Sequence, residues 1–277
     1  MKSNGKFAGL LKRVLQRRQL YLLLALPLVY LIIFSYIPMF GVQIAFKNYT
    51  PARGIWGSEW VGFKYFIRFF KSYQFTGIIR NTLIVSIYQI VVSTPSAIIL
   101  ALLINAAECK WFKKTIQTVT YIPHFISVVV LIGMINQIFN PIAGIYGSAY
   151  SMLFHKAAPN ILGIPKAFYH TYVWSEIWQN TGWSSIIYVA ALASSDQALH
   201  EAAQIDGASR FKRMIYIDLP VIVPTMVILL IMKCGQIMSV GYTKTLLMQN
   251  SFNISYSEVI STYVYKVGLG TNGNYSY

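Results

Sequence analysis

Long apolar runs alternate with shorter polar segments along this chain. The five longest runs cover residues 20–46, 78–107, 115–139, 170–193 and 220–241. Each is close to the ~20 residues that an α-helix needs to cross the hydrocarbon core of a bilayer. The pattern therefore predicts an all-α fold, a polytopic bundle of membrane helices with five spans visible. Pro27 and Pro38 interrupt the first run, which membrane helices tolerate when neighbouring groups satisfy the freed backbone.

The polar segments between the runs differ in their density of positive charge. One set consists of residues 1–19, 108–114 and 194–219. The other consists of residues 47–77, 140–169 and 242–277. The first set carries 12 Lys and Arg residues in 52 positions, and the second carries 9 in 97. Because basic residues are enriched in cytoplasmic loops, we expect the first set, and the N-terminus with it, inside. Residues 1–19 would then form a cytoplasmic basic tail and residues 20–277 a single transmembrane domain.

The first outer segment contains an amphipathic stretch. Phe63, Phe66, Ile67 and Phe70 share one face of a helix, and the basic residues at 64, 68 and 71 share the other. Such a helix is typical of a segment that lies in the membrane interface. A loop helix that packs against the bundle gives the same pattern, and the sequence favours neither interpretation.

Composition agrees with a membrane protein and excludes several other classes. Hydrophobic residues make up 56% of the chain, charged residues 11%, and the formal net charge is +15. The basic residues cluster between apolar runs, which argues against nucleic-acid binding. Cys109 and Cys234 lie far apart without a CxxC pair, so we expect free thiols. The four histidines form no metal-ligand pattern. No phosphate-binding GxxxxGK[ST] sequence or catalytic set occurs, so we expect neither an ATPase nor another enzyme.

The most specific pattern is EAAQIDGASRFKRMIYIDLP at residues 201–220. It predicts a short polar helix, a glycine break and a second short helix in a loop over residues 194–219, between two spans. Asp196 is placed to cap the first helix, and Gly207 to end it in the left-handed conformation. The Ala202–Ala203 pair keeps the helix thin, so that a partner can approach its backbone. Glu201 offers a carboxylate to an Arg in that partner; alternatively it only solvates the helix.

This pattern resembles the EAA loop of the permease subunits of binding-protein-dependent ATP-driven (ABC) importers. The fixed positions of that loop are all present, at Glu201, Ala202, Ala203, Gly207, Ile217, Leu219 and Pro220. An ordinary amphipathic helix–turn–helix is the alternative. The resemblance covers nearly the whole chain and is strongest to maltose-type carbohydrate permeases. It implies that the loop couples to an ATPase subunit through Glu201, Ala202, Ala203, Asp206, Gly207 and Arg210.

The resemblance also implies a fold, a location and partners. The fold is that of a type I ABC importer permease, in a bacterial plasma (inner) membrane. The partners are a second permease, two nucleotide-binding ATPase subunits, an extracytoplasmic solute-binding protein and membrane lipid. ATP and Mg would be bound by the ATPase subunits, and this chain would hold no cofactor or metal. Such permeases commonly have six core helices. We expect the sixth after the sequence STYVYKVGLG, and it is absent from these 277 residues.

Polar residues inside the apolar runs are candidates for the translocation path, because ionisable groups in a membrane are costly. These candidates are Glu176, Trp178, Gln179, Asn180, Lys233 and Gln236. Aromatic faces stack on sugar rings, and carboxylates and amides hydrogen-bond sugar hydroxyls. A wet cavity of sugar size between helices would suit this mixture. The alternatives are that the tryptophans form an interfacial belt and that Lys233 pairs with a carboxylate across the bundle.

Three other functions remain to be weighed. The same machine for another solute, such as phosphate or a peptide, is compatible with the loop pattern. An ion-coupled secondary carrier would need intramembrane carboxylates for the coupling ion, and Glu176 is the sole acid well inside a run. A membrane enzyme would need a catalytic set. Dependence on a separate ATPase distinguishes an ABC importer from the last two.

Overall fold

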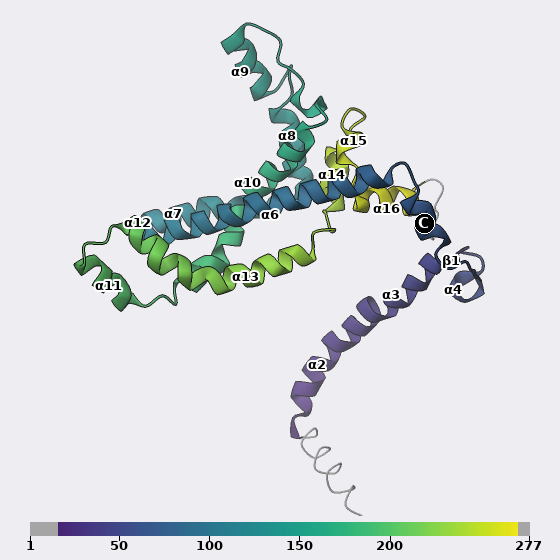
Figure 1. Cartoon of the computed structure of the whole chain (residues 1–277), viewed down its shortest axis with the longest axis horizontal. Coiled ribbons are helices and arrows are strands. Elements are labelled where there is room, and N and C mark those ends of the chain that lie inside the picture. The colour runs from purple at the N-terminus through teal and green to yellow at the C-terminus, as the bar shows by residue number, and fades with distance from the viewer. Residues whose placement is uncertain (1–15, 271–277) are drawn as a thin grey trace, which may run out of the picture. The chain divides into compact units, whose positions relative to one another are not determined.

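The computed structural model describes residues 16–270 of the 277 in the chain. Residues 16–72 with 267–270 form one compact unit, and residues 73–266 form a second (Figure 1). Most of the described residues are helical, and their one sheet has two short strands, so the all-α prediction is confirmed. The basic tail expected over residues 1–19 lies almost entirely outside the described residues.

The first unit begins with the expected first span. Its helical run covers Arg18–Phe46, with α2 (Arg18–Leu31), η1 (Ile32–Tyr36), α3 (Ile37–Met39) and η2 (Phe40–Phe46). Pro27 lies inside α2 and Pro38 inside α3, and the π-helical turn η1 lies between them. The run is long and apolar enough to cross a membrane, and none of its most apolar window is buried within the chain. A bilayer or a partner helix can therefore cover it on every side.

A small folded segment, residues 47–70, follows this helix. Strands β1 (Lys47–Asn48) and β2 (Glu59–Trp60) pair in antiparallel fashion around the short helix α4 (Gly54–Gly57). Phe46 stacks on Trp60 at 5.6 Å between ring centroids and also contacts Phe63 and Phe66 at the start of α5 (Lys64–Phe70). The predicted amphipathic helix is thus present, and part of its aromatic face packs on Phe46.

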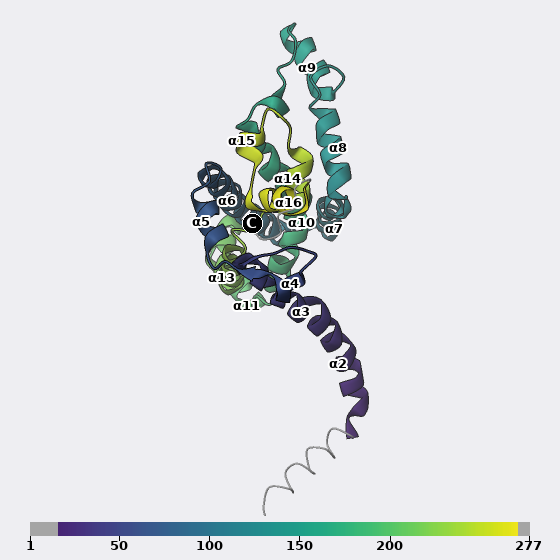
Figure 2. The ribbon, with the colours of Figure 1, turned by 90° about the vertical axis from the view of Figure 1, so that its right-hand side faces the viewer.

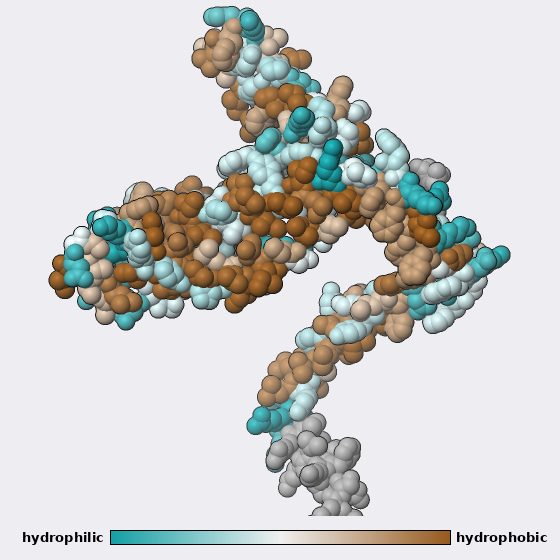
Figure 3. All heavy atoms as spheres, viewed as in Figure 1, coloured by the Kyte–Doolittle hydropathy of each residue, from teal (hydrophilic) through white to brown (hydrophobic). Residues whose placement is uncertain are grey.

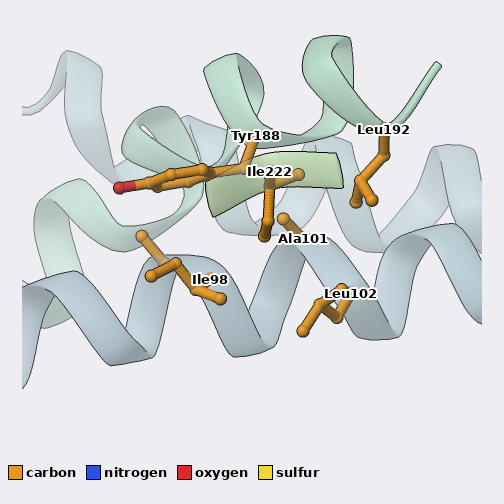
Figure 4. Close-up of a cluster of buried hydrophobic side chains, with 7 residues drawn as sticks. Ile98, Ala101, Leu102, Tyr188, Leu192 and Ile222 are labelled. Carbon is orange, nitrogen blue, oxygen red and sulfur yellow. The ribbon is translucent and has the colours of Figure 1, made fainter. Parts of the chain in front are cut away.

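Two long helices form the centre of the second unit, α6 (Phe75–Ala106) and α10 (Ala167–Leu192). Around them lie α7 (Lys110–Tyr121), η3 (Ile122–Phe125), α8 (Val128–Ile138), α9 (Ile145–Phe154), η4 (Ile161–Gly163), α11 (Gln197–Ile205), α12 (Arg210–Arg213), η5 (Met214–Asp218), α13 (Leu219–Gly235), α14 (Tyr242–Met248), α15 (Ile254–Ser257) and α16 (Ile260–Leu269). In the buried cluster of Figure 4, Ala101 of α6 and Tyr188 of α10 meet Ile222 of α13. This cluster joins the three helices that surround the site described below.

Helices α7 and α10 approach so closely that only glycine fits at the contact. A β-carbon on Gly182 of α10 would lie 2.0 Å from the carbonyl oxygen of Thr120 in α7. Small residues at such crossings allow close packing of helix backbones in membranes. The contact fixes α7 against the middle of α10, beside the polar residues of that helix.

The predicted count of five spans is not reproduced. Three helical runs are long and apolar enough to cross a membrane, Arg18–Phe46, Phe75–Ala106 and Arg210–Gly235, and a bent pair adds a fourth. Helix α10, which corresponds to the predicted span 170–193, is long enough but is not among them. It carries buried polar side chains such as Gln179 and Ser185, so its mean hydropathy understates how deeply it is enclosed.

The third predicted span is not one straight helix. Residues Lys110–Phe125 and Val128–Ile138 meet at an angle of 99°, and Figure 2 shows α8 rising above α7. Pro123 lies in the 3₁₀ turn η3 before the break. Ser127 then caps α8, because its hydroxyl accepts a hydrogen bond from the Val130 amide at 3.3 Å. A proline and a new helix cap together explain a sharp bend in an apolar run.

The second helix of the loop also differs from the prediction. It is not a separate short helix, because α12, η5 and α13 run on continuously from Arg210 to Gly235. The π-helical turn η5 takes up the join, and Pro220 sits in the first turn of α13. The loop therefore passes directly into the last apolar run of the bundle.

Candidate functional site

The loop at one end of the bundle has the capped geometry that the sequence predicts. The Asp196 carboxylate accepts a hydrogen bond from the Ala198 amide at 2.9 Å and caps α11. Gly207 has a φ of 75°. Its amide bonds the Gln204 carbonyl at 3.1 Å, and the next amide, of Ala208, bonds Ala203 at 2.9 Å. These two bonds form a Schellman motif, which closes the C-terminal end of a helix. Both local predictions are confirmed.

The surface of this loop is open. Glu201, Ala202 and Asp206 are exposed, and Ala203 is half-buried. Large apolar side chains are exposed beside them, among which Ile205 is 86% and Phe211 65% accessible. In Figure 3 hydrophobic surface runs along the helices, and polar residues gather at the end that carries α11 and α12. A carboxylate flanked by exposed apolar side chains is suited to contact with another protein.

Arg210 differs from the other predicted coupling residues because it already has a partner. Its guanidinium lies 2.8 Å from the Glu108 carboxylate, in the turn between α6 and α7, and both side chains are exposed. Exposed ion pairs contribute little to stability. This pair ties α12 to the neighbouring turn without fixing it firmly.

A buried polar cluster that the sequence did not reveal lies under the loop. The Asp218 carboxylate, 4% exposed, accepts from Asn105 Nδ2 at 3.1 Å and lies 3.2 Å from His200 Nε2. A polar cavity of about 380 Å³ opens beside it, and Arg213 is among its lining residues. Asp218 is the variable position in the Ile-x-Leu-Pro pattern, so only its acidic side chain could have indicated a buried polar cluster at this position. The cluster connects α11 to α6 and to the start of α13.

Three of the six predicted path residues line one cavity between α6, α10 and α13. This cavity measures about 310 Å³, and Glu176, Asn180 and Lys233 lie in its wall. Trp183, one of the tryptophans that the sequence places around Glu176, also lines it. The lining residues that the sequence did not reveal are Gln89, Ser93, Ile177, Thr181 and Ser184. Hydroxyl, amide, charged and indole groups thus converge in the middle of the bundle.

Glu176 is the anchor of a hydrogen-bonded chain. Its Oε2 atom lies 2.7 Å from Lys244 Nζ, and its Oε1 atom accepts from Asn180 Nδ2 at 2.6 Å. Asn180 Oδ1 lies 2.7 Å from His124 Nδ1, and the His124 ring stacks on Trp183 at 4.4 Å. Lys244 comes from α14, a segment that the sequence showed only as polar tail. Its side chain is 5% exposed, so the ion pair with Glu176 is nearly buried.

Lys233 has hydroxyl groups in place of an acidic partner. Its Nζ atom donates to Ser93 Oγ at 3.2 Å and to Thr94 Oγ1 at 3.0 Å, both on α6. No ion pair of Lys233 occurs in the described part of the chain. The alternative of a carboxylate partner across the bundle is therefore not realised within residues 16–270.

The structure does not bring the other three path candidates into this cavity. Trp178 lines a separate apolar groove between α8 and α10, of about 410 Å³. Gln179 is buried and donates to the Ile126 carbonyl at 2.7 Å, which anchors α10 to the bend before α8. Gln236 is exposed where α13 ends. Sequence position places all three near Glu176 or Lys233. Trp178, two positions after Glu176, falls on another face of α10, and Gln236 lies just beyond the end of α13.

Cys109 and Cys234 are free thiols, as predicted. Between residues 16 and 270 no group of three or more His, Cys, Asp or Glu side chains is arranged to hold a metal ion.

An apolar helical bundle with a polar cavity inside and a capped, exposed loop at one end is the build of a membrane transport subunit. Residues 74–267, which are almost the second unit, match the family described as binding-protein-dependent transport system inner membrane component. The chain belongs to this family. It is therefore a multi-pass membrane protein and a permease component of an ABC importer, not an enzyme.

Two relatives from Bacillus subtilis (strain 168) are similar to nearly the whole of this chain. Protein LplB is 40% identical, over 99% of this chain and 85% of LplB. The polygalacturonan/rhamnogalacturonan transport system permease protein YteP is 38% identical, over 97% of this chain and 83% of YteP. Among solved structures, a bacterial ABC transporter that imports the acidic polysaccharide alginate gives a TM-score of 0.87 at 36% identity, covering 96% of this chain and 90% of that one.

Proposed function

We propose that this chain is a transmembrane subunit of a bacterial ATP-driven importer and forms, with a second permease, the path for an oligosaccharide. The observation that carries this proposal is the cavity of Glu176, Asn180 and Lys233, where hydrogen-bonding groups lie beside the partly exposed indole of Trp183. Sugars offer hydroxyls to the former and an apolar ring face to the latter. The relatives add support, because YteP and the alginate transporter are named for the transport of polysaccharides.

The loop is the proposed point of coupling. Two nucleotide-binding subunits would bind ATP and Mg, and their closure would move α11 and the start of α12. Glu201 is exposed and forms no ion pair within the described residues, so it is available to an Arg in a partner groove. A solute-binding protein would deliver substrate from outside. A related alginate transporter has been solved with its periplasmic protein carrying an alginate pentasaccharide.

The decisive experiment measures ATP hydrolysis by the reconstituted importer. We expect oligosaccharides presented by the binding protein to stimulate hydrolysis. The Glu201→Lys variant should need an ATPase-subunit concentration at least about tenfold higher to reach the same rate of hydrolysis. The reason is that a charge-assisted pair worth about 1.5–3 kcal/mol becomes a repulsion. Glu59→Lys, on the β2 strand of the first unit, makes the same charge change outside the loop sequence and should behave as the unmodified protein. Stimulation by phosphate or peptides, with none by any oligosaccharide, would contradict the proposal.

The proposed orientation places the N-terminus, Cys109 and the loop in the cytoplasm, because the segments that contain them are rich in Lys and Arg. In a Cys234→Ala background, a membrane-impermeant thiol reagent applied to intact cells should leave Cys109 unlabelled and should label it after permeabilisation. Ile142→Cys, in a chain lacking both native cysteines, should be labelled without permeabilisation, since residue 142 is 90% exposed in an expected outer segment. The reverse labelling pattern would show that the N-terminus and the loop lie outside the cytoplasm.

A further inference from the structure

Lys233 is a cation in the last turn of an apolar helix, and no acidic side chain pairs with it among residues 16–270. It lies on α13, in a run that is long and apolar enough to cross a membrane, and its side chain is half-buried. A charge in such an apolar run is costly and is normally paired or placed at a water-filled path. Ser93 and Thr94 solvate the ammonium but do not neutralise it.

Glu176, the acid in the wall of the same cavity, is already neutralised. Lys244 lies 2.7 Å from its carboxylate, and Asn180 holds the other oxygen at 2.6 Å. Since the Glu176–Lys244 pair sums to no net charge, Lys233 leaves the cavity with one positive charge in excess. A cavity that carries this charge attracts an anion.

The remaining lining groups indicate what kind of anion fits. Thr181 Oγ1 is buried and has no hydrogen-bond partner within the described residues, and Gln89 and Ser184 add polar groups to the same wall. Trp183 adds an aromatic ring to the wall; His124 covers one of its faces, and the residue is 45% exposed. An inorganic anion would use the charge and leave the aromatic face idle. A sugar unit that carries a carboxylate would use all of these features.

We propose that Lys233 binds the carboxylate of an acidic sugar unit, so that this subunit selects uronate-containing oligosaccharides. This inference rests on the proposed function and narrows its substrate class. The competing occupant is a carboxylate of the second permease, which would make Lys233 an assembly residue.

The test uses the complete reconstituted importer with its binding protein and four versions of this chain. The probes are oligogalacturonides and oligoalginates, compared with neutral malto- and galacto-oligosaccharides. Lys233→Gln removes the charge and keeps a hydrogen-bond donor, and Lys233→Arg keeps the charge. Lys64→Gln, an exposed site on α5, controls for the loss of one positive charge elsewhere. The binding protein is the same throughout, so its own selectivity cancels when variants are compared.

We expect acidic oligosaccharides to stimulate ATP hydrolysis. Lys233→Gln should raise the concentration for half-maximal stimulation by at least about tenfold, the loss expected for one charge-assisted bond. Lys233→Arg should keep this concentration close to that of the unmodified chain, and Lys64→Gln should leave it unchanged. Stimulation by neutral sugars alone, or acidic stimulation that Lys233→Gln leaves unchanged, would overturn the inference and leave the importer function standing. Failure of Lys233→Gln to assemble, where Lys233→Arg assembles, would assign Lys233 to the subunit interface. Failure of every saccharide would defeat the proposed function itself.

Discussion

The Gly207→Val variant is expected to lose most substrate-stimulated ATP hydrolysis while it still inserts into the membrane. Gly207 has a φ of 75°, a region that costs a β-branched residue on the order of 1–3 kcal/mol. Valine would break the two hydrogen bonds that close α11 and misdirect α12, which begins three residues later. Residue 207 lies outside the apolar runs, so insertion should not change. Measured ATP hydrolysis and the amount of ATPase subunit that co-purifies should fall together.

Gly133→Val is the matched control for this variant. Gly133 lies inside α8 with negative φ, and a β-carbon there would meet no atom within 4 Å. The substitution adds the same side chain to a membrane helix without left-handed strain. Stimulation of the Gly207→Val importer equal to that of the Gly133→Val importer would remove the basis for a coupling role of the loop.

The Glu176→Gln variant should lower the thermal stability of the permease strongly. It leaves the Lys244 ammonium, 5% exposed, without its carboxylate, and breaking a buried ion pair in this way costs about 3–5 kcal/mol. The melting temperature of the purified permease, followed by size-exclusion chromatography after heating, measures this effect. Lys244→Met should be similarly harmful, because it strands the Glu176 carboxylate.

The double variant Glu176→Gln/Lys244→Met should recover much of the lost stability, since it removes both charges at once. Glu108→Gln is the control, because it breaks an ion pair of similar length, 2.8 Å, between two exposed side chains. Its effect should stay below about 1 kcal/mol. Equal losses for Glu176→Gln and Glu108→Gln would show that the Glu176–Lys244 pair is not buried in the protein as it stands in the membrane.

Local features of the site could be predicted from sequence because their causes are local. The cap by Asp196 depends on a bond two residues away, and the left-handed turn at Gly207 depends on the absence of a β-carbon. The first and second apolar runs likewise became helices close to their predicted limits. In each case the physical reason lies within a few residues along the chain.

Partners that are distant along the chain could not be predicted. Lys244 pairs with Glu176 across 68 positions, and Lys233 bonds hydroxyls 139 and 140 positions away. The residues of one apolar run do not indicate which other helix will pack against that run. Helix α10 illustrates the same limit of prediction from sequence. Its low hydropathy reflects contacts with α6, α7 and α13 that the alternation of apolar and polar segments does not encode.

The unbroken helix from Arg210 to Gly235 has a mechanical consequence. Arg210 and Lys233 are 23 residues apart on one rod, a separation of about 35 Å at 1.5 Å per residue. A rod of that length pivoted by about 5° at one end carries the other end through about 3 Å, roughly the length of a hydrogen bond. We therefore expect the helix to act as a lever arm. A small tilt imposed at the loop is enough to part Lys233 from the α6 hydroxyls that solvate it.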